Sequence, residues 1–303
     1  MGYNIAIKKQ LESSGVRILM LNDRPYNAVY DFFKKISIST IKLFQLLSWY
    51  FKLRNIDLSK YDVVLMIRGE HVPISVLKKL QAAGLKMIMY QWDSIQNCDY
   101  LHQVDYFSKV ATFDREDSKL HGFHYFPLFF RKEYAEIKIN TTKKKKALFI
   151  GTFQAKRYAS VLELKERLKE VEIDTTIKIK IPYYYYYYYY YKLSFKGIRL
   201  DRNYLMFKNI TFKEILELYT HYDIIIDVAN EHQSGLTMRT FEALGANKIL
   251  LTNNEAIKQE LFYKFGNIIM INAPFLQQNF KSEIQQNLVN NHRLDNWIFA
   301  LLS

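Results

Sequence analysis

The feature that most limits what this chain can fold into is a repeated alternation of short and long apolar segments. Short runs of strand length, rich in β-branched residues, are followed by longer stretches whose apolar residues recur at helical spacing. In the first half we expect strands at residues 16–21, 63–67, 86–90, 110–113 and 125–126, and helices at 26–52, 74–83 and 116–120. This alternation is typical of a parallel sheet covered by helices, because neighbouring parallel strands need a long crossover connection.

The same alternation begins again after residues 136–146, a stretch without apolar periodicity that ends in four consecutive lysines. We expect further strands at 147–150, 176–181, 224–228, 249–252 and 268–271, further helices at 157–171, 212–219, 236–244 and 255–262, and a closing helical region from residue 277. The length of 303 residues is about twice that of a typical single domain. The predicted fold class is therefore α/β, with two Rossmann-like doubly wound domains facing across a cleft, at residues 1–140 and 147–275, and a helical region at 276–303.

Nine consecutive tyrosines at residues 183–191 form the one low-complexity tract. Neither a strand nor a helix requires nine identical aromatic residues, because successive positions face different surroundings. We interpret the tract as an expanded repeat in a surface loop, with an aromatic binding platform as the alternative.

The composition limits the class of protein and its partners. A single cysteine, Cys98, cannot form an internal disulfide, which favours a reducing compartment and a cytoplasmic protein. No segment has the length of a signal-peptide core or of a membrane span, so we expect a soluble or peripheral protein. The net charge of +13 favours partners that carry phosphate, namely nucleic acid, a nucleotide or an anionic lipid. Nucleic acid is the least favoured, because the sequence has no zinc-ligand spacing, no RNP-type aromatic motif and no basic helix followed by heptads.

Common enzyme signatures are absent from the sequence. It contains no G-x-G-x-x-G, no G-x-x-x-x-G-K-[ST], no H-E-x-x-H and no G-x-S-x-G, which argues against a dehydrogenase, a P-loop nucleotidase, a zincin and an α/β-hydrolase. His121 and His124 have no further ligands at metal spacing, so we interpret them as surface residues and expect no metal.

The segment F-I-G-T-F-Q-A-K-R-Y (149–158) is the first candidate for chemistry. Here an expected strand ends at Gly151 and is followed by an expected helix. A glycine at this place lets the backbone approach a ligand, and the helix N-terminus favours negative charge. Thr152 can donate its hydroxyl, and Lys156 or Arg157 can neutralise a diphosphate. A simple strand-to-helix turn is the alternative.

The segment N-E-H-Q-S-G-L-T-M-R-T-F-E-A-L-G (230–245) is the second candidate. Ser234 and Gly235 suit the start of a helix whose free N–H groups would lie at the carboxyl end of a strand. Arg239 and Glu242 are three residues apart, so both can lie on one helical face. The alternative is an i,i+3 ion pair that has only a structural role.

Taken in order, these segments resemble the donor-nucleotide domain of GT-B glycosyltransferases. The motifs that carry the resemblance are F-I-G-T-F…R, T-F-K-E-I-L-E-L-Y…Y-D-I-I-I-D and S-G-L-T-M-R-T-F-E-A-L-G…L-L-T-N-N. The chain is most similar to the CgeB-like enzymes and to bacterial glycosyltransferases of lipopolysaccharide or capsule biosynthesis. The resemblance covers residues 147–254, and the first half only by its pattern and the strand end Y-Q-W-D-S (90–94).

The resemblance implies a hexosyltransferase that moves a sugar from a nucleotide-sugar donor to a glycan or glycolipid acceptor. It implies a donor site in which Gly151, Thr152 and Arg157 hold the diphosphate, Gly235 and Leu236 offer backbone N–H groups, Glu242 accepts ribose hydroxyls, and Arg239 adds positive charge near the leaving group. Retaining families commonly carry a second glutamate eight residues before the ribose-binding one. That position is Ser234 here and Glu231 is out of register, so retaining and inverting stereochemistry both stay open.

Such a reaction can proceed without a metal, because a helix N-terminus and two arginines can stabilise the charge that develops on the leaving diphosphate. An inverting mechanism needs a general base from the acceptor side. Asp93 is our first candidate for the catalytic base, followed by Asp114 and His71. For each, a structural or surface role is the alternative.

Residues 32–54 mix large apolar side chains with lysines and an arginine. This composition suits a helix that lies on an anionic membrane surface, and a core helix with a basic outer face is the alternative. For the whole chain, two other functions stay open: a non-catalytic nucleotide-sugar-binding protein of the same fold, and a basic nucleic-acid binder. A sugar-nucleotide epimerase would need more acids and histidines than these segments provide.

Overall fold

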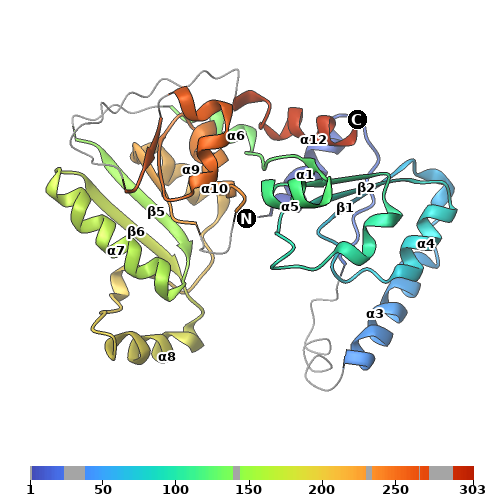
Figure 1. Ribbon diagram of the computed structural model, residues 1–303, viewed down its shortest axis with the longest axis horizontal. Helices are drawn as coiled ribbons and strands as arrows, with labels where there is room; N and C mark the ends of the chain where they lie inside the picture. Colours follow the sequence, from blue (N-terminus) through green and yellow to red (C-terminus); the bar gives the residue numbers. More distant parts are fainter. Residues whose placement is uncertain (1, 24–37, 139–143, 230–233, 266, 273–288) are drawn as a thin grey trace. The chain divides into compact units, whose positions relative to one another are not determined.

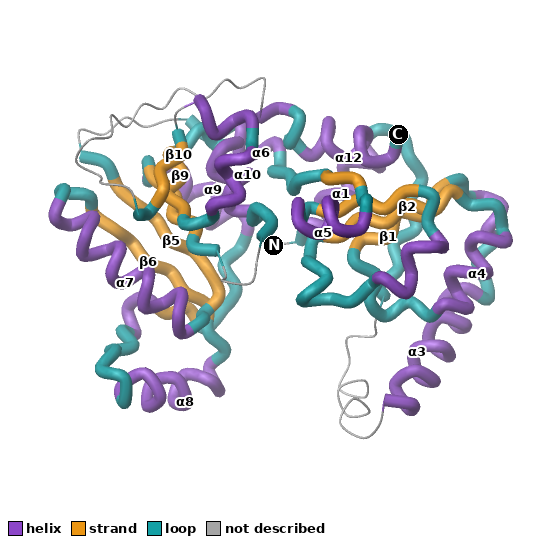
Figure 2. Tube along the Cα trace, in the orientation of Figure 1, coloured by secondary structure: helices purple, strands orange, loops and turns teal. Residues whose placement is uncertain are grey.

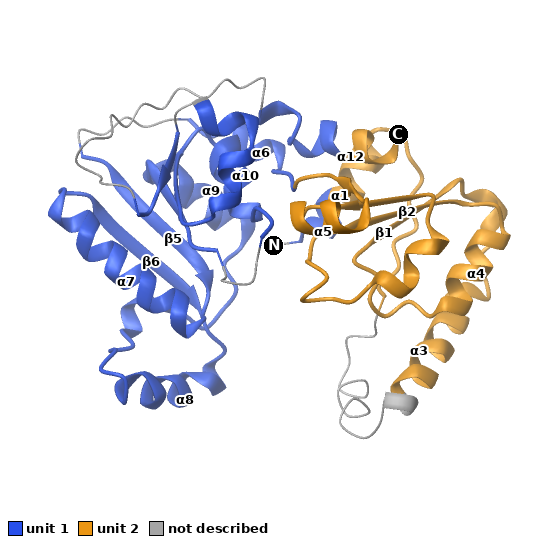
Figure 3. Cartoon of the chain, viewed as in Figure 1, with its two compact units in different colours: residues 1–6, 128–297 blue, residues 7–127, 298–303 orange. Residues whose placement is uncertain are grey.

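The structure is a computed structural model that describes residues 2–23, 38–138, 144–229, 234–265, 267–272 and 289–303. The chain forms two compact units (Figure 3). Unit 1 comprises Met1–Ala6 and Leu128–Trp297, and unit 2 comprises Ile7–Pro127 and Ile298–Ser303. Each unit contains one parallel sheet with helices beside it (Figure 2), so the predicted α/β class with two Rossmann-like units is confirmed. The boundary between the units falls at Pro127–Leu128. The sequence pattern had placed the end of the first domain later, at residue 140.

Unit 1 is built on a six-stranded sheet. Its strands are β5 (Lys146–Thr152), β6 (Asp174–Lys180), β7 (Leu205–Met206), β8 (Ile224–Asp227), β9 (Ile249–Thr252) and β10 (Ile268–Met270). Its α-helices are α6 (Lys132–Ala135), α7 (Ala155–Glu170), α8 (Tyr183–Ser194), α9 (Phe212–His221) and α10 (Met238–Gly245), and its short 3-10 helices are η3 (Arg202–Tyr204), η4 (Glu255–Gln259) and η5 (Leu261–Phe265).

The strand order in unit 1 is β10-β9-β8-β5-β6-β7, with all neighbours parallel. The chain thus starts in the middle at β5, moves outward to β7, and returns to the other side of β5 with β8. Figure 1 accordingly shows α7 on one side of the sheet and α9 and α10 on the other. This reversal makes a topological switch point between β5 and β8, where open α/β sheets bind their ligands at the carboxyl ends of the strands.

The core of unit 1 explains why these runs become strands. All four residues of β8, Ile-Ile-Ile-Asp, are buried, as expected for a central parallel strand that is covered on both faces. The buried face of α7 carries Tyr158, Val161, Leu164 and Leu168 against the same core.

Gly245, the last residue of α10, has a packing role. A Cβ atom at this position would lie 2.3 Å from Cδ2 of Phe130. Only glycine therefore lets the Phe130 ring, which is 1% exposed, pack against the helix.

Unit 2 is built on a four-stranded parallel sheet with the strand order β1-β2-β3-β4. Its strands are β1 (Val63–Ile67), β2 (Lys86–Gln91), β3 (Lys109–Thr112) and β4 (His124–Tyr125), and its helices are α3 (Ile38–Leu53), α4 (Ile74–Ala82), α5 (Arg115–His121), and the 3-10 helices η1 (Leu58–Lys60) and η2 (Leu101–Tyr106). Helices α1 (Tyr3–Ser13) and α12 (Leu294–Leu302) each contribute residues to both units.

The carboxyl end of α12 is fixed to the sheet of unit 2. Lys86 Nζ, at the start of β2, donates to the carbonyl of Leu302 at 3.0 Å, and Lys109 Nζ, at the start of β3, donates to that of Leu301 at 2.9 Å. Lysines at these positions satisfy carbonyls that the helix itself cannot pair.

Two expectations about strands and helices are wrong, and a third differs in its bounds. Residues 16–21 form no strand, and Val16, Leu19 and Met20 of this run are exposed. Residues 255–262 form the 3-10 helices η4 and η5 instead of one α-helix. The helix expected at 236–244 is confirmed as α10, and its first residue is Met238, after the N-cap Thr237.

The tyrosine tract is a helix and not the expected loop. Helix α8 follows Pro182 and buries Leu193, while Tyr186 and Tyr189 pack against the core of unit 1. The spacing of three to four residues between these positions is that of one helical face. Seven of the nine tyrosines are at least 40% exposed, which explains why identical residues can occupy the remaining positions.

Two further expectations fall partly on residues outside the described ranges. The long helix expected at 26–52 is described from Ile38, as α3, and the preceding residues 24–37 lie outside. The closing helical region expected from 277 lies partly in residues 273–288, also outside, and its described helix is α12.

Candidate functional site

The switch point of unit 1 brings both predicted donor-site segments to one edge of the sheet. β5 ends at Thr152 and β8 ends at Asp227, and the two strands pair in parallel with Ala147 opposite Ile224. The ends of β5 and β8, and the described residues that directly follow them, therefore lie at the same edge of the sheet.

Gly151 and Arg157 are neighbours at the end of β5. A Cβ atom at Gly151 would lie 3.0 Å from Cζ of Phe149 and 3.9 Å from Nη1 of Arg157. The guanidinium of Arg157, in the first turn of α7, thus lies beside the bare backbone of Gly151. Thr152, the last residue of β5, is exposed.

Asp227 organises the start of α10. Its Oδ2 accepts hydrogen bonds from the hydroxyls of Thr237 at 2.6 Å and Thr240 at 2.9 Å. The Thr237 hydroxyl in turn accepts from the backbone N–H of Thr240, as an N-cap does. Burial raises the pKa of Asp227, and the two threonine hydroxyls partly oppose that rise.

Arg239 is enclosed by unit 1. Its Nη1 donates to Glu242 Oε2 at 3.0 Å and to the Tyr219 hydroxyl at 3.2 Å, and its Nη2 donates to the carbonyl of Ile150 at 3.3 Å. Burial acts to lower the pKa of Arg239, but Tyr219 and Glu242 outweigh it and hold that pKa well above its usual value. Arg239 thus links α10 to the end of β5.

Glu242 is 1% exposed, and each of its oxygens has a protein partner. Arg239 bonds Oε2, and the hydroxyl of Tyr3 donates to Oε1 at 2.5 Å. Burial, and next the charge of Glu242, raise the pKa of Tyr3 well above its usual value, so this phenol keeps its proton. The ring of Tyr3 also packs edge to face on Phe129, at 6.0 Å between centroids.

Two guanidiniums act on each other at this edge of the sheet. Burial lowers the pKa of Arg157; Asp227 opposes the change, and Arg239 lowers the pKa further. Both arginines lie at the carboxyl end of β5, where Arg157 is beside Gly151 and Arg239 donates to the carbonyl of Ile150. Such an arrangement is suited to a diphosphate.

Gly235 and Leu236 lie just before α10 and both are buried. The carbonyl of Gly235 accepts from Nδ2 of Asn254 at 3.1 Å, which links the residues just before α10 to those just after β9. Glu231 lies outside the described residues.

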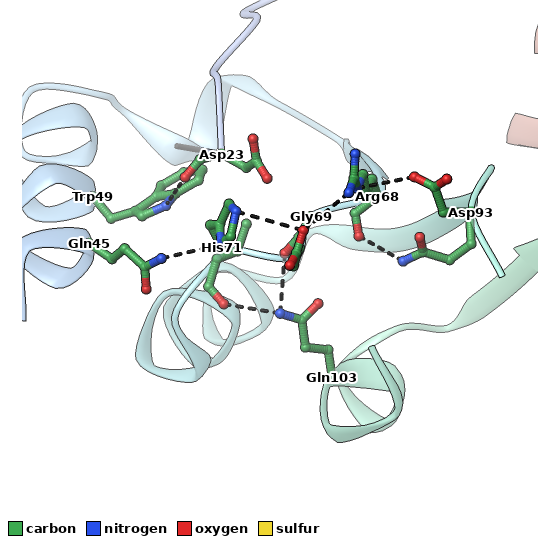
Figure 4. A network of polar contacts seen from close by, with 11 residues as sticks. Asp23, Gln45, Trp49, Arg68, Gly69, His71, Asp93 and Gln103 are labelled. Carbon is green, nitrogen blue, oxygen red and sulfur yellow. Dashed lines mark hydrogen bonds and ion pairs between the residues drawn. The ribbon is translucent and has the colours of Figure 1, made fainter. Parts of the chain in front are cut away.

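In unit 2, the proposed base Asp93 lies just after β2, in an ion pair (Figure 4). Its Oδ2 is 3.2 Å from Nε of Arg68, and Nη2 of Arg68 is 3.3 Å from Oε2 of Glu70. His71 lies on the same loop, with Nε2 3.7 Å from Glu70 Oε2 and Nδ1 3.3 Å from Nε2 of Gln45.

Asp114, the second candidate base, is fully buried and caps α5. Its carboxylate accepts from the backbone N–H groups of Glu116 at 2.9 Å and Asp117 at 3.3 Å. These contacts are those of an N-cap and give Asp114 a structural function.

Sequence reasoning missed Asp227, Tyr3, Arg68 and Glu70. Asp227 had a signal, because a carboxylate ends a buried apolar strand at the ligand-binding edge of the sheet. Tyr3 had none, since 239 residues separate it from Glu242.

Within the described ranges, no three histidine, cysteine, aspartate or glutamate side chains lie together as a metal site would require. Of the helices that the structure describes, none is long and apolar enough to span a bilayer.

Comparison with known proteins gives no sequence family for the chain. No protein-family model matches it, and no curated protein matches it. Among solved structures it is similar to the spinosyn rhamnosyltransferase SpnG, at 9% identity and a TM-score of 0.43, over 97% of this chain and 75% of that one. It is also similar to Anabaena HepE, solved in complex with UDP and glucose, at 10% identity and a TM-score of 0.46, over 97% of this chain and 83% of that one.

Proposed function

We propose that the chain is a glycosyltransferase that uses a nucleotide-sugar donor. The observation that carries the proposal is the pair Arg157 and Arg239 beside Gly151 at the switch point of a doubly wound sheet. This position suits a nucleotide, and two guanidiniums suit its diphosphate.

In the proposed site, Gly151, Thr152 and Arg157 contact the diphosphate, and Gly235 and Leu236 approach it by their backbone. Glu242 accepts the ribose hydroxyls. The Tyr3 hydroxyl, which bonds Glu242 Oε1, occupies the place that a ribose hydroxyl would take, so the ribose has to displace it.

The proposed reaction forms a bond between an acceptor hydroxyl oxygen and the anomeric carbon of the donor. The bond from that carbon to the phosphate oxygen breaks, and its electron pair leaves with the nucleoside diphosphate. Arg157 and Arg239 stabilise the negative charge that develops there, so the proposal requires no metal. In an inverting reaction the hydroxyl proton passes to a general base, for which we propose Asp93.

We further propose that the acceptor belongs to a lipopolysaccharide or capsule and that the protein works on the inner face of the cytoplasmic membrane. Helix α3 supports attachment to a membrane. Its side chains Leu43, Leu46, Leu47, Tyr50 and Phe51 are all exposed and recur at helical spacing, while Trp49 and Leu53 face the core. Exposed Lys42 and Arg54 lie at the two ends of this apolar face and suit anionic headgroups.

The proposed function is tested by thermal-shift measurements with UDP-, GDP-, ADP- and CMP-sugars, followed by an assay for released nucleotide. We expect one nucleotide class to stabilise the chain and to be released when an acceptor glycan is added. Stabilisation by none of them, together with retention on DNA or RNA, would contradict the proposal. Stabilisation without release would instead favour a non-catalytic binding protein.

A further inference from the structure

The loop that follows β1 in unit 2 is held in an unusual backbone shape. Arg68 has φ +67° and Gly69 has φ +66°, so two consecutive residues are left-handed. A Cβ atom at Gly69 would lie 2.1 Å from the sulfur of Met66, so any other residue would be strained at this φ and would require the Met66 side chain to move. Arginine rarely adopts this conformation, which persists only where the surroundings enforce it.

Two buried glutamines enforce it. Nε2 of Gln91 donates to the carbonyl of Arg68 at 2.7 Å, and Nε2 of Gln103 donates to the carbonyls of Gly69 and Val72, both at 3.2 Å (Figure 4). Both glutamines are 0% exposed. The loop is therefore built in advance, and strain of this kind is concentrated at functional sites.

This rigid loop presents Arg68 between two carboxylates. The side chains of Arg68, Glu70 and Asp93 are 40%, 36% and 32% exposed, so a ligand can reach all three. Asp93 and Glu70 both ion-pair with the guanidinium, so the three side chains together carry one more negative charge than positive charge, which disfavours an anion. Arg68 holds the two carboxylates apart and in place, as a planar fork can.

The edge of the sheet around this loop is acidic, although the chain as a whole carries +13. Residues 68–71, 93–94 and 114–117, which follow β1, β2 and β3, contain five acidic side chains and two arginines. Two buried polar atoms at the end of β2 lack a hydrogen-bond partner in the described part of the chain. They are Gln91 Oε1 and Ser94 Oγ, in residues that are 0% and 3% exposed.

We propose that the Arg68–Glu70–Asp93 cluster binds the end group of the acceptor and selects a neutral or amino sugar over an acidic one. This inference rests on the proposed glycosyltransferase function and names its acceptor class. The two carboxylates accept hydrogen bonds from sugar hydroxyls or from an ammonium group. A uronic acid carboxylate or a phosphate placed there meets like charge, which Arg68 does not offset. Glu70 is then the residue that sets specificity.

Saturation-transfer NMR on the full chain with three simple probes tests the proposal: methyl glucoside, methyl glucosaminide and methyl glucuronide. We expect the glucosaminide and the glucoside to bind and the glucuronide to bind at least about tenfold more weakly at low salt, a difference that shrinks as salt is added. Glu70→Gln should bring the glucuronide closer to the glucoside. The matched control Asp57→Asn removes one charge from an exposed position of the same unit and should leave the ratio unchanged.

Equal or tighter binding of the glucuronide, binding of none of the three sugars, or an unchanged ratio in Glu70→Gln would each overturn the proposal. If Glu70→Gln does not fold, Asp93→Asn should likewise bring the glucuronide closer to the glucoside. The salt titration of the unmodified chain tests the same electrostatic preference. The thermal shift with nucleotides, measured on the same preparation, tests the donor site and does not depend on the result for the sugars. Sugar binding in the expected order without any nucleotide shift would therefore refute the proposed function. The cluster would then remain a sugar-binding site, but not an acceptor site.

Discussion

Tyr3 and Glu242 make the contact in unit 1 with the clearest consequence at the scale of single residues. The Tyr3 hydroxyl donates to a carboxylate that is 1% exposed, so its removal leaves a buried oxygen of Glu242 without this donor. Tyr3→Phe should lower the free energy of unfolding by about 1–3 kcal/mol. Tyr50→Phe, at a side chain that is 63% exposed, is the matched control and should change it by less than about 0.5 kcal/mol.

The same variant separates two functions of Glu242. If ribose replaces the Tyr3 hydroxyl, Tyr3→Phe should bind the nucleoside diphosphate more tightly, because the competing donor is gone. A thermal shift with ligand that is larger in Tyr3→Phe than in the parent chain checks this. A shift that is equal or smaller would mean that Glu242 serves only to fix Tyr3 and Arg239.

His292 provides a pH-dependent contribution to the stability of unit 1. Burial lowers its pKa, and its Nδ1 lies 3.2 Å from the carbonyl of Leu128. Because the folded pKa lies below the unfolded one, the contribution is present above the unfolded value and is lost as pH falls through the folded value. The free energy of unfolding, measured by urea, should decrease from pH 7 to pH 5 in the parent chain and not in His292→Gln. An equal decrease in both chains would contradict this.

At the scale of elements, α8 gives a prediction about the tyrosine tract. Tyr189 lies 4.7 Å from Phe153 between ring centroids, and Tyr186 lies 5.8 Å from Phe207. Tyr186→Ala with Tyr189→Ala should therefore lower the free energy of unfolding by about 2–4 kcal/mol. The control pair Tyr184→Ala and Tyr187→Ala, 76% and 55% exposed, should lower it by less than about 1 kcal/mol. Similar losses in both pairs would mean that α8 does not pack by this face.

Helix α3 gives a prediction about membrane binding. Leu47→Glu with Phe51→Glu should reduce co-sedimentation with phosphatidylglycerol vesicles at least about tenfold, because both side chains belong to the exposed apolar face. Leu120→Glu with Leu261→Glu makes the same charge change at side chains that are 78% and 72% exposed and lie outside α3. The α3 proposal is refuted if the two pairs sediment alike.

The elements also show where sequence reasoning succeeds and fails. Three consecutive isoleucines at 224–226 correctly predict a strand, because β-branched residues suit the centre of a parallel sheet. The run at 16–21 has a similar local pattern but forms no strand, since a local pattern does not show whether a segment joins a sheet. The tract at 183–191 carries no periodicity, since identical residues hide which positions face the core. The left-handed turn at Arg68 depends on Gln91 and Gln103, which are distant in sequence.

At the scale of the whole molecule, the alternating pattern predicts two α/β units but not the path of the chain between them. Helices α1 and α12, at opposite ends of the sequence, each contribute residues to both units. Local sequence patterns do not show to which unit a terminal segment belongs. The donor segments were predictable because the carboxyl ends of parallel strands share one edge of a sheet. The enclosure of Arg239 and Glu242 by Tyr3 and Tyr219 was not.

The central claim is that unit 1 holds a nucleoside diphosphate through Arg157, and isothermal titration with UDP, GDP and ADP measures it most directly. One of them should bind the parent chain. Arg157→Gln should weaken that binding by about 10–100-fold, because it removes charge-assisted hydrogen bonds to phosphate. Arg167→Gln makes the same change farther along α7 and should alter binding by less than about twofold. Binding of none of the three nucleotides, or equal weakening by both substitutions, would contradict the account.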